Sequence, residues 1–521
     1  DNLGDYNEET VGISMGRFWN LPFGRGNALL TFERGKREAF LRGDNPYLRQ
    51  DLTAFGGLDG RLSSNGATPG IPGNIVVGTT NGATNPNMPT AGAYVYYGLP
   101  AGTNGVGLTY ADLRMNQPNL LDSSDYTDWT GKVDRKQATL YVNQEFSPKV
   151  SAFLQASFND RDTVSRSMTG QSGVVINDIS IAPGQPFYIS GFPMAPPQII
   201  GWDPVLGFIY GPQTPPTLQV QYNAFKDIGH GTWNSSDRSL TWTAGVKAEL
   251  AGGWKGEFTY TDSSSKTCGY CIIGNYVNPE AFKAQVAAGN INPFSTAPLS
   301  DAQVATFIGS NVQKSESGMQ HAVLKFNGPL FSIPGGKVRA AAGVEYNKSS
   351  QSLFNEANRN ADNAYIRDTV SNLERDVKSA FAEFYIPVIG KDNAVTGIKE
   401  LSLSAAYRYD KYSDAGKASN PKLGFTWAIN DDFKFRGSWG TSFRSPNLPE
   451  RNPGVFSARI IAPSGNNSGD PAIVNAFPGT TIAALFFGSN ANLKPEESTN
   501  WSAGFDWELP VVEALRLSTT Y

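Results

Sequence analysis

The chain has 521 residues, of which 40% are hydrophobic and 12% aromatic, and its formal net charge is −4. The mean hydropathy is −0.32, and no segment approaches the roughly 20 apolar residues of a membrane-spanning helix, which excludes a helical membrane protein. The slightly negative net charge also does not indicate nucleic-acid binding, which is typical of basic domains. A transmembrane β-barrel stays compatible, because interior polar residues alternate with lipid-facing apolar ones and dilute the hydropathy.

Alternating apolar and polar residues predict a series of antiparallel hairpins along the whole chain. In the clearest one, Leu240, Trp242 and Val246 share one face, and Lys247 and Glu249 share the other. We predict about 14 strands of this kind. They are centred on residues 11–15, 28–32, 138–146, 150–158, 240–250, 254–261, 322–326, 338–346, 380–386, 401–409, 423–427, 433–440, 501–509 and 515–517.

Three long segments, from Gly43 to about Lys132, from about Thr163 to Ser236 and from about Lys266 to Ser317, interrupt the short-turn hairpins. Successive strands of a meander reverse direction, so these segments should all leave the sheet at the same end. Loops held by a rigid scaffold often carry binding function. Candidate ligand-binding aromatics of the first two segments are Tyr94, Tyr96, Tyr97, Trp202, Tyr210 and Trp233, which could instead only pack the loops on themselves.

The two cysteines, Cys268 and Cys271, fall in the third long segment, where residues 279–289 are predicted to form a short helix. A zinc site would need two more ligands, and a thioredoxin-like redox motif would need a βαβ context. A Cys268–Cys271 disulfide in an oxidising compartment needs nothing further, and we favour it.

Two phrases near the end of the chain are more specific than the strand pattern. The first is Gly-Thr-Ser-Phe-Arg-Ser-Pro-Asn-Leu-Pro-Glu at 440–450, and the second is Leu-Lys-Pro-Glu at 493–496. They resemble the GTSFRAPNLPE and LKPE phrases of TonB-dependent outer-membrane transporters, with a departure at Ser445. The motif residues are Arg444, Pro446, Asn447, Glu450, Lys494, Pro495 and Glu496.

The resemblance implies an all-β fold: an antiparallel transmembrane β-barrel that is part of a barrel of about 22 strands with long extracellular loops. Residues 1–521 would be a partial barrel domain, without the N-terminal plug and the last strands, and the wall should be open. No signal peptide is visible, and we expect the sequence to begin inside a longer protein. The family implies the outer membrane of a Gram-negative bacterium, contact with the lipid bilayer and lipopolysaccharide, and energy from a TonB-ExbB-ExbD complex through the plug. Small-molecule substrates of the family include siderophores, haem, cobalamin, nickel complexes and carbohydrates.

Four other classes are weighed against this interpretation. A soluble β-sandwich also alternates, but it has no reason to place its long loops at one end. A passive porin would have about 16 to 18 strands and lack the two phrases. A surface receptor or adhesin would use the loops without transport. An enzyme would show a nucleophile and a base, and the two histidines, His230 and His321, belong to no such motif. We expect no catalytic residues, cofactor or metal.

Overall fold

The computed structural model describes residues 7–61, 70–78, 94–167, 175–194, 199–203, 207–210, 215–274, 276–358, 360–451, 456–461, 483–509 and 515–521. Strands dominate these residues. The helices within them are short, and none combines the length and the apolar composition that crossing a membrane requires.

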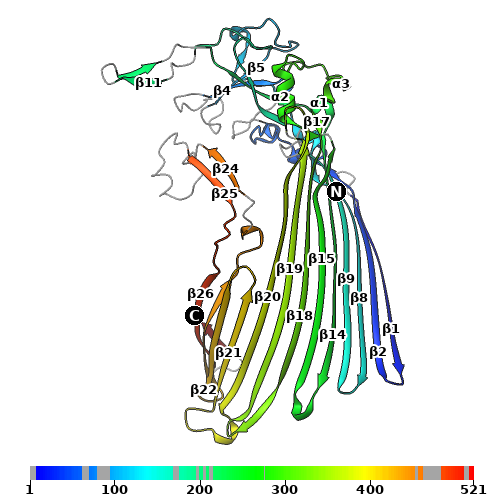
Figure 1. Cartoon of the computed structure of the whole chain (residues 1–521), viewed down its shortest axis with the longest axis vertical. Helices are drawn as coiled ribbons and strands as arrows, with labels where there is room; N and C mark the ends of the chain where they lie inside the picture. Colours follow the sequence, from blue (N-terminus) through cyan, green and yellow to red (C-terminus); the bar gives the residue numbers. More distant parts are fainter. Residues whose placement is uncertain are drawn as a thin grey trace.

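The main element is a single antiparallel sheet of 14 strands, which we call the wall. Its strands follow one another in chain order and lie side by side (Figure 1). They are β1 (Glu8–Leu21), β2 (Gly24–Arg37), β8 (Lys132–Ser147), β9 (Val150–Ser167), β14 (Gly231–Glu249), β15 (Lys255–Gly274), β18 (Asn311–Ile333), β19 (Gly336–Asn358), β20 (Tyr365–Ile389), β21 (Glu400–Tyr412), β22 (Lys417–Ala428), β23 (Phe433–Arg444), β26 (Glu496–Glu508) and β27 (Arg516–Thr520).

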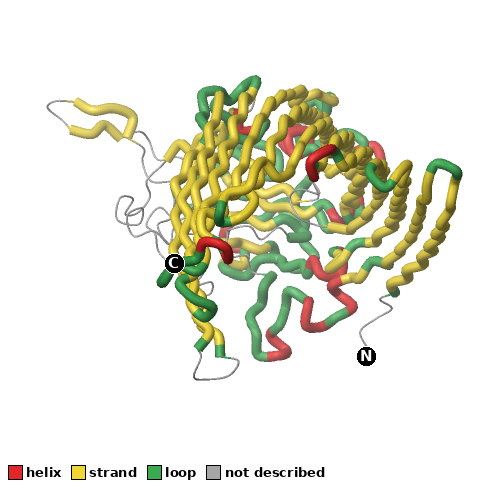
Figure 2. Tube along the Cα trace, turned by 90° about the horizontal axis from the view of Figure 1, so that it is seen from below, coloured by secondary structure: helices red, strands yellow, loops and turns green. Residues whose placement is uncertain are grey.

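The wall curves but does not close among the described residues. β1 pairs only with β2, and β27 pairs only with β26 (Figure 2). This confirms the predicted open wall and the predicted strand count, whereas the larger total of about 22 strands stays a prediction. β20 has 25 residues, more than twice the about 9 to 11 that a transmembrane β-strand needs.

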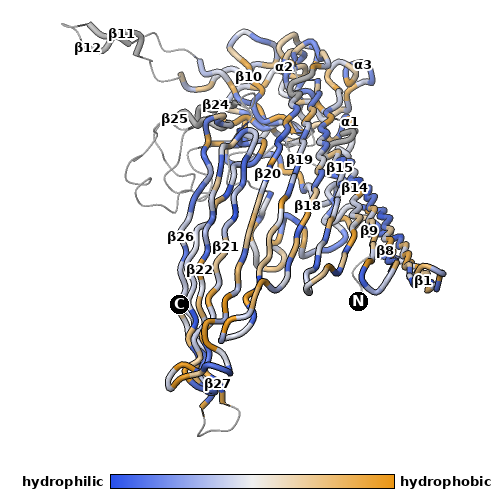
Figure 3. The backbone as a smooth tube through the Cα atoms, turned by 60° about the horizontal axis from the view of Figure 1, so that its bottom comes forward, coloured by the Kyte–Doolittle hydropathy of each residue, from blue (hydrophilic) through white to orange (hydrophobic). Residues whose placement is uncertain are grey.

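The strand register separates an apolar from a polar face. Val246 lies opposite Ala152 on one side and Phe258 on the other, and Phe505 lies opposite Phe435. The other strand pairs continue this apolar face from β1 to β27. Hydrophobic residues gather mostly on the halves of the strands near the short turns (Figure 3). Trp242 contacts Tyr260 on the apolar face. Because Lys247 is an odd number of positions from Trp242 and the register is regular between them, Lys247 lies on the opposite face, as predicted.

Close strand approach at the first short turn requires a glycine. Gly24 begins β2 with a φ of +133°, and a Cβ built there would lie 1.7 Å from the backbone oxygen of Glu145 on β8. Only glycine meets both conditions without strain. The short turn therefore sets the first hairpin directly beside the next strand.

A compact cap covers the opposite end of the wall (Figure 1). It contains a five-stranded sheet in the order β10-β13-β4-β5-β6. Its elements are β4 (Asn74–Gly78), β5 (Tyr94–Gly98), β6 (Arg114–Met115), β10 (Val175–Ile181), β13 (Leu218–Asn223), α1 (Phe225–Ile228), α2 (Pro279–Ala287) and α3 (Asp301–Val304). Two-stranded pairs are β3 (Phe40–Leu41) with β7 (Asp128–Thr130), β11 (Ile199–Asp203) with β12 (Gly207–Tyr210), β16 (Tyr276–Val277) with β17 (Ile308–Gly309), and β24 (Phe456–Ile461) with β25 (Ala483–Gly488).

The predicted short helix at 279–289 is confirmed as α2. The side chain of Asn278 caps it by accepting hydrogen bonds from the backbone N–H groups of Glu280 and Ala281, at 3.2 and 3.4 Å. Pro279 occupies the first turn, where a missing N–H costs nothing. The helix thereby presents Phe282 to the interior of the cap, where it is fully buried.

Two of the three long segments are shorter than predicted. β9 runs to Ser167 and β14 starts at Gly231, while β15 runs to Gly274 and β18 starts at Asn311. Trp233, Cys268 and Cys271 therefore lie on wall strands, which corrects their assignment to loops. The reason is that polar residues occupy both faces of β9 at 159–163, β14 at 234–239, β15 at 262–267 and β18 at 313–317, so the apolar alternation that marks a strand in the sequence is interrupted there.

Candidate functional site

The cap has one hydrophobic core to which all three long segments contribute. Ile75 comes from the first segment, Tyr222 from the second and Phe282 from the third, and all three are fully buried. The Phe282 ring lies 5.2 Å from that of Tyr222 and 5.1 Å from that of Phe307. The segments are therefore packed together as one body.

One of the predicted ligand-binding aromatics, Tyr97, belongs to this core, and its chain neighbour Tyr96 is also buried. Tyr96 is 0% exposed and Tyr97 is 7% exposed. The Tyr97 ring contacts the rings of Tyr110 and Phe192, with centroids 5.6 and 5.4 Å apart. Burial raises the pKa of the Tyr97 phenol, and its hydrogen bond with Tyr110 raises it further. Both tyrosines thus pack the cap, and ligand contact by either stays a prediction.

The other candidate aromatics are spread over several elements. Trp233 lies half-buried on β14, opposite Ser165 of β9. Tyr94 begins β5, Trp202 belongs to β11 and Tyr210 ends β12, but their side chains lie outside the described ones. The structure therefore does not gather these aromatics into one described site.

The polar face of the later wall strands carries a charged cluster. Arg408 forms two hydrogen bonds to the Glu345 carboxylate, at 3.1 and 2.8 Å, and its Nε donates to Asp410 at 3.0 Å. Ser379 Oγ donates to Asp410 at 2.5 Å, and His321 Nε2 lies 3.8 Å from Glu345. Arg408 on β21 reaches Glu345 on β19 across β20, as expected for side chains that converge on the concave side of a curved wall. No sequence motif marks this cluster.

Arg436, Asp506 and Glu508 follow the same arrangement. Arg436 pairs with Asp506 across β23 and β26, and Glu508 lies two residues further along β26 on the same face. The three residues therefore share one polar face of the wall.

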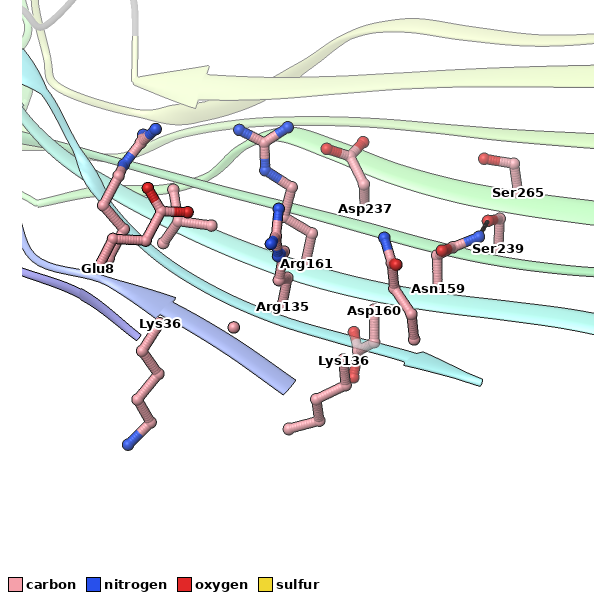
Figure 4. Close-up of a pocket in the computed structure, with 14 residues that line it drawn as sticks. Glu8, Lys36, Arg135, Lys136, Asn159, Asp160, Arg161, Asp237, Ser239 and Ser265 are labelled. Atoms are coloured by element: carbon pink, nitrogen blue, oxygen red, sulfur yellow. Dashed lines mark hydrogen bonds between the residues drawn. The ribbon is translucent and has the colours of Figure 1, made fainter. Parts of the chain in front are cut away.

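A cavity of about 430 Å³ lies on the polar face of the early strands, near their cap end. Arg135, Arg161 and Asp237 point into it, whereas Lys36 and Lys136 point to the other side of the sheet (Figure 4). Arg135 approaches Glu33 to 3.4 Å. Its side chain lies across Gly35, where a Cβ would come within 2.5 Å of Arg135 Nε. The cavity thus combines both signs of charge.

The residues of the two sequence phrases meet at the cap end of β23 and β26. Arg444 and Glu496 lie directly opposite each other, and their charged atoms are 3.8 Å apart. Arg444 also lies 3.9 Å from Glu450, whose carboxylate accepts a hydrogen bond from the backbone N–H of Asn447 at 2.7 Å. Pro446 between them is buried. The residues of the two phrases therefore hold together the two ends of the loop that joins β23 and β26.

Arg451, directly after the first phrase, extends this junction. It donates to the backbone oxygen of Leu493 at 2.6 Å, just before Lys494 and Pro495 lead into β26. Arg451 Nε lies 3.8 Å from Asp414, which also accepts two hydrogen bonds from Arg375, at 2.8 and 2.7 Å. The sequence did not single out Arg375, Asp414 or Arg451, because their partners come from distant strands.

Cys268 is disulfide-bonded and 8% exposed, on β15. The Cys271 side chain lies outside the described ones. The Cys268–Cys271 pairing stays a prediction.

An antiparallel wall with one apolar face, short turns at one end and a loop cap at the other defines the class of membrane β-barrel proteins. Residues 195–521 match the profile of the family described as "TonB dependent receptor-like, beta-barrel". The match covers more than half of the chain, so the chain belongs to this family.

Individual relatives share less with the chain. A protein of Acinetobacter baumannii described as a probable TonB-dependent siderophore receptor, PirA, is 26% identical over 144 residues, which are 28% of this chain and 16% of that protein. The crystal structure of the siderophore receptor PirA from Acinetobacter baumannii matches with a TM-score of 0.45 and 12% identity, over 99% of this chain and 49% of that one. A mutant of the ferric enterobactin receptor PfeA from Pseudomonas aeruginosa matches with a TM-score of 0.46 and 12% identity, over 98% and 50%. The chain thus spans about half the length of these solved relatives.

Proposed function

We propose that the full-length protein is an active importer of the outer membrane, which takes up a scarce nutrient with energy delivered through TonB. The observation that carries this proposal is the family match over residues 195–521. The apolar face of the wall supports insertion into a lipid bilayer. Within hydrocarbon a sheet must close into a barrel, because an open edge would leave backbone groups unpaired. The cap then faces the outside, and the TonB complex and a plug are the further partners.

The class of cargo follows from the relatives only in outline. The curated relative and the two solved receptors are described as siderophore or ferric enterobactin receptors, which favours a metal chelate. Cobalamin and carbohydrates are the alternatives to a metal chelate.

The test is uptake by cells that express the full-length protein, compared with cells from which its gene is deleted. Radiolabelled ferric siderophores, cobalamin and oligosaccharides are supplied separately at limiting concentration. We expect saturable accumulation of one class, which stops when TonB is deleted. Uptake that persists without TonB and rises linearly with concentration would instead identify a passive porin. Surface binding without accumulation would identify a receptor or adhesin.

A further inference from the structure

Three lysines lie side by side on the apolar face of the wall. Lys378 of β20 lies directly opposite Lys411 of β21, which lies directly opposite Lys417 of β22. All three residues are exposed. Ser379 and Asp410, the chain neighbours of the first two lysines, meet on the polar face, so the lysines lie on the other side of the sheet. Neighbouring strands are about 4.8 Å apart, so three long side chains from adjacent strands can reach one small ligand. We call these three residues the lysine triad.

The lysine triad marks the border of the apolar side chains toward the cap. Each lysine is the twelfth residue of its strand, counted from the short-turn end. About 9 to 11 residues of a strand cross the hydrocarbon core, so the triad lies just beyond it. Toward the short turns the same face carries Tyr407, Phe384 and Leu423, which are all exposed. Toward the cap its next row carries the charged residues Lys348 and Asp376. The triad therefore lies at the level of the lipid head groups on the cap side.

The charge of the lysine triad is not compensated among the residues that the structure describes, where no carboxylate forms an ion pair with it. Asp376, two residues from Lys378 on the same face, accepts a hydrogen bond from the Tyr346 hydroxyl at 2.7 Å. Lys348 and Glu374 pair with each other at 3.1 Å. Like charges directly opposite each other destabilise a sheet. The triad is therefore a local excess of positive charge that costs stability unless an anion binds to it.

Cationic residues at the same level of the early strands are arranged differently. Lys136, Arg238 and Lys266 are also the twelfth residues from the short-turn ends of their strands, and they lie on the same face of the wall. Asp160 lies directly opposite both Lys136 and Arg238, and Glu316 lies directly opposite Lys266. Arg238 is 3.2 Å from Asp160, and Lys266 is 3.2 Å from Glu316. The early strands thus supply their own anions at this level, whereas the triad calls for an anion from outside the chain.

We propose that the lysine triad binds a phosphate group of a lipid in the outer leaflet. Each lysine is a compact cation with three N–H donors, and three lysines together match the several oxygens of one phosphate. Their aliphatic stems can lie along the apolar surface beside Tyr407 while the ammonium groups reach the head-group level. This continuity with the apolar face favours a lipid, whose acyl chains would cover that face, over a phosphate free in solution. The inference goes beyond the proposed import and requires only that the wall is inserted with the cap outside.

The test is lipid binding by the full-length protein in a neutral detergent, counted by native mass spectrometry. The probe is diphosphoryl lipid A, and phosphatidylcholine, which is zwitterionic, is the control lipid. We expect diphosphoryl lipid A to fill one tight site that phosphatidylcholine does not fill. The triple variant Lys378→Gln, Lys411→Gln and Lys417→Gln should raise the dissociation constant of this site about 100-fold, which is about fivefold for each lysine.

Two further variants separate the position of the charge from its amount and from folding. The matched control Lys136→Gln, Arg238→Gln and Lys266→Gln removes the same number of cations at the same level of the wall. It should change the dissociation constant less than about twofold, because these cations are already paired. Lys→Arg replacement of all three triad residues keeps the cations and should retain the site, which the glutamine variant loses.

A soluble anion distinguishes a lipid from a free phosphate. Inorganic pyrophosphate has no acyl chains and should not displace diphosphoryl lipid A at equal concentration. Displacement at equal concentration would show a site for a soluble anion and would overturn the proposal. Equal lipid binding by the unmodified protein and the glutamine variant of the triad would overturn it as well. Uptake independent of TonB would overturn the proposed function and leave this inference standing.

Discussion

Replacement of Phe282 by alanine should destabilise the whole cap and not only α2. Phe282 is fully buried and its ring contacts Tyr222 from the second long segment and Phe307 from the third. Truncation of a buried phenylalanine costs about 3 to 5 kcal/mol, which includes the cavity that it leaves. Every 1.4 kcal/mol corresponds to a factor of ten, so amide exchange governed by cap opening should accelerate about 100- to 4000-fold.

Hydrogen exchange of the full-length protein, read by mass spectrometry, measures this effect. We expect faster exchange in β4 and β5 of the first segment and in β13 of the second, with no change in β14 or β19 of the wall. Phe55→Ala is the control, because the Phe55 ring is 52% exposed and its loss should change stability by less than about 0.5 kcal/mol. Faster exchange confined to α2 would show that the three segments are not one cooperative body.

Three further outcomes are expected. Burial and the Asp227 carboxylate raise the pKa of Tyr222 above its usual value, so its contribution to cap stability is complete below about pH 10 and is lost as the pH rises further; Tyr222→Phe should reduce this alkaline loss in a pH series of hydrogen exchange. Arg408→Met should lower the apparent melting temperature, because it removes the charged hydrogen bonds to Glu345 and Asp410, each worth about 1.5 to 3 kcal/mol, and leaves Asp410, 2% exposed, without its guanidinium partner. Alkylation before and after reduction should show Cys268 and Cys271 blocked as a disulfide; two free thiols in the untreated protein would reject the pairing.

The wall could be predicted from the sequence wherever its two faces lie in different surroundings. Leu240, Trp242 and Val246 alternate with polar residues because one face meets lipid and the other meets the polar interior. The prediction ended early along β15 and began late along β18, because there both faces are polar and alternation vanishes. Strand length beyond the membrane is set by pairing with neighbours, which a local pattern does not reveal.

The site was predictable only in part, for a similar reason. The motifs around Arg444 and Glu496 could be recognised from their residue sequence. The structure shows that the two residues are direct cross-strand neighbours. Phe282 was missed as a core residue, since its partners Tyr222 and Phe307 are distant in sequence. The burial of Tyr97 was one of two interpretations left open, because it depends on Tyr110 and Phe192, whose proximity a local sequence pattern does not reveal.

TonB-dependent accumulation tests the central claim most directly. Cells that express the full-length protein are supplied with the labelled cargo identified by the uptake panel, and its internal concentration is followed with and without TonB. We predict accumulation above the external concentration only when TonB is present. Equal internal concentrations in both strains would contradict the claim that this protein is an energised importer.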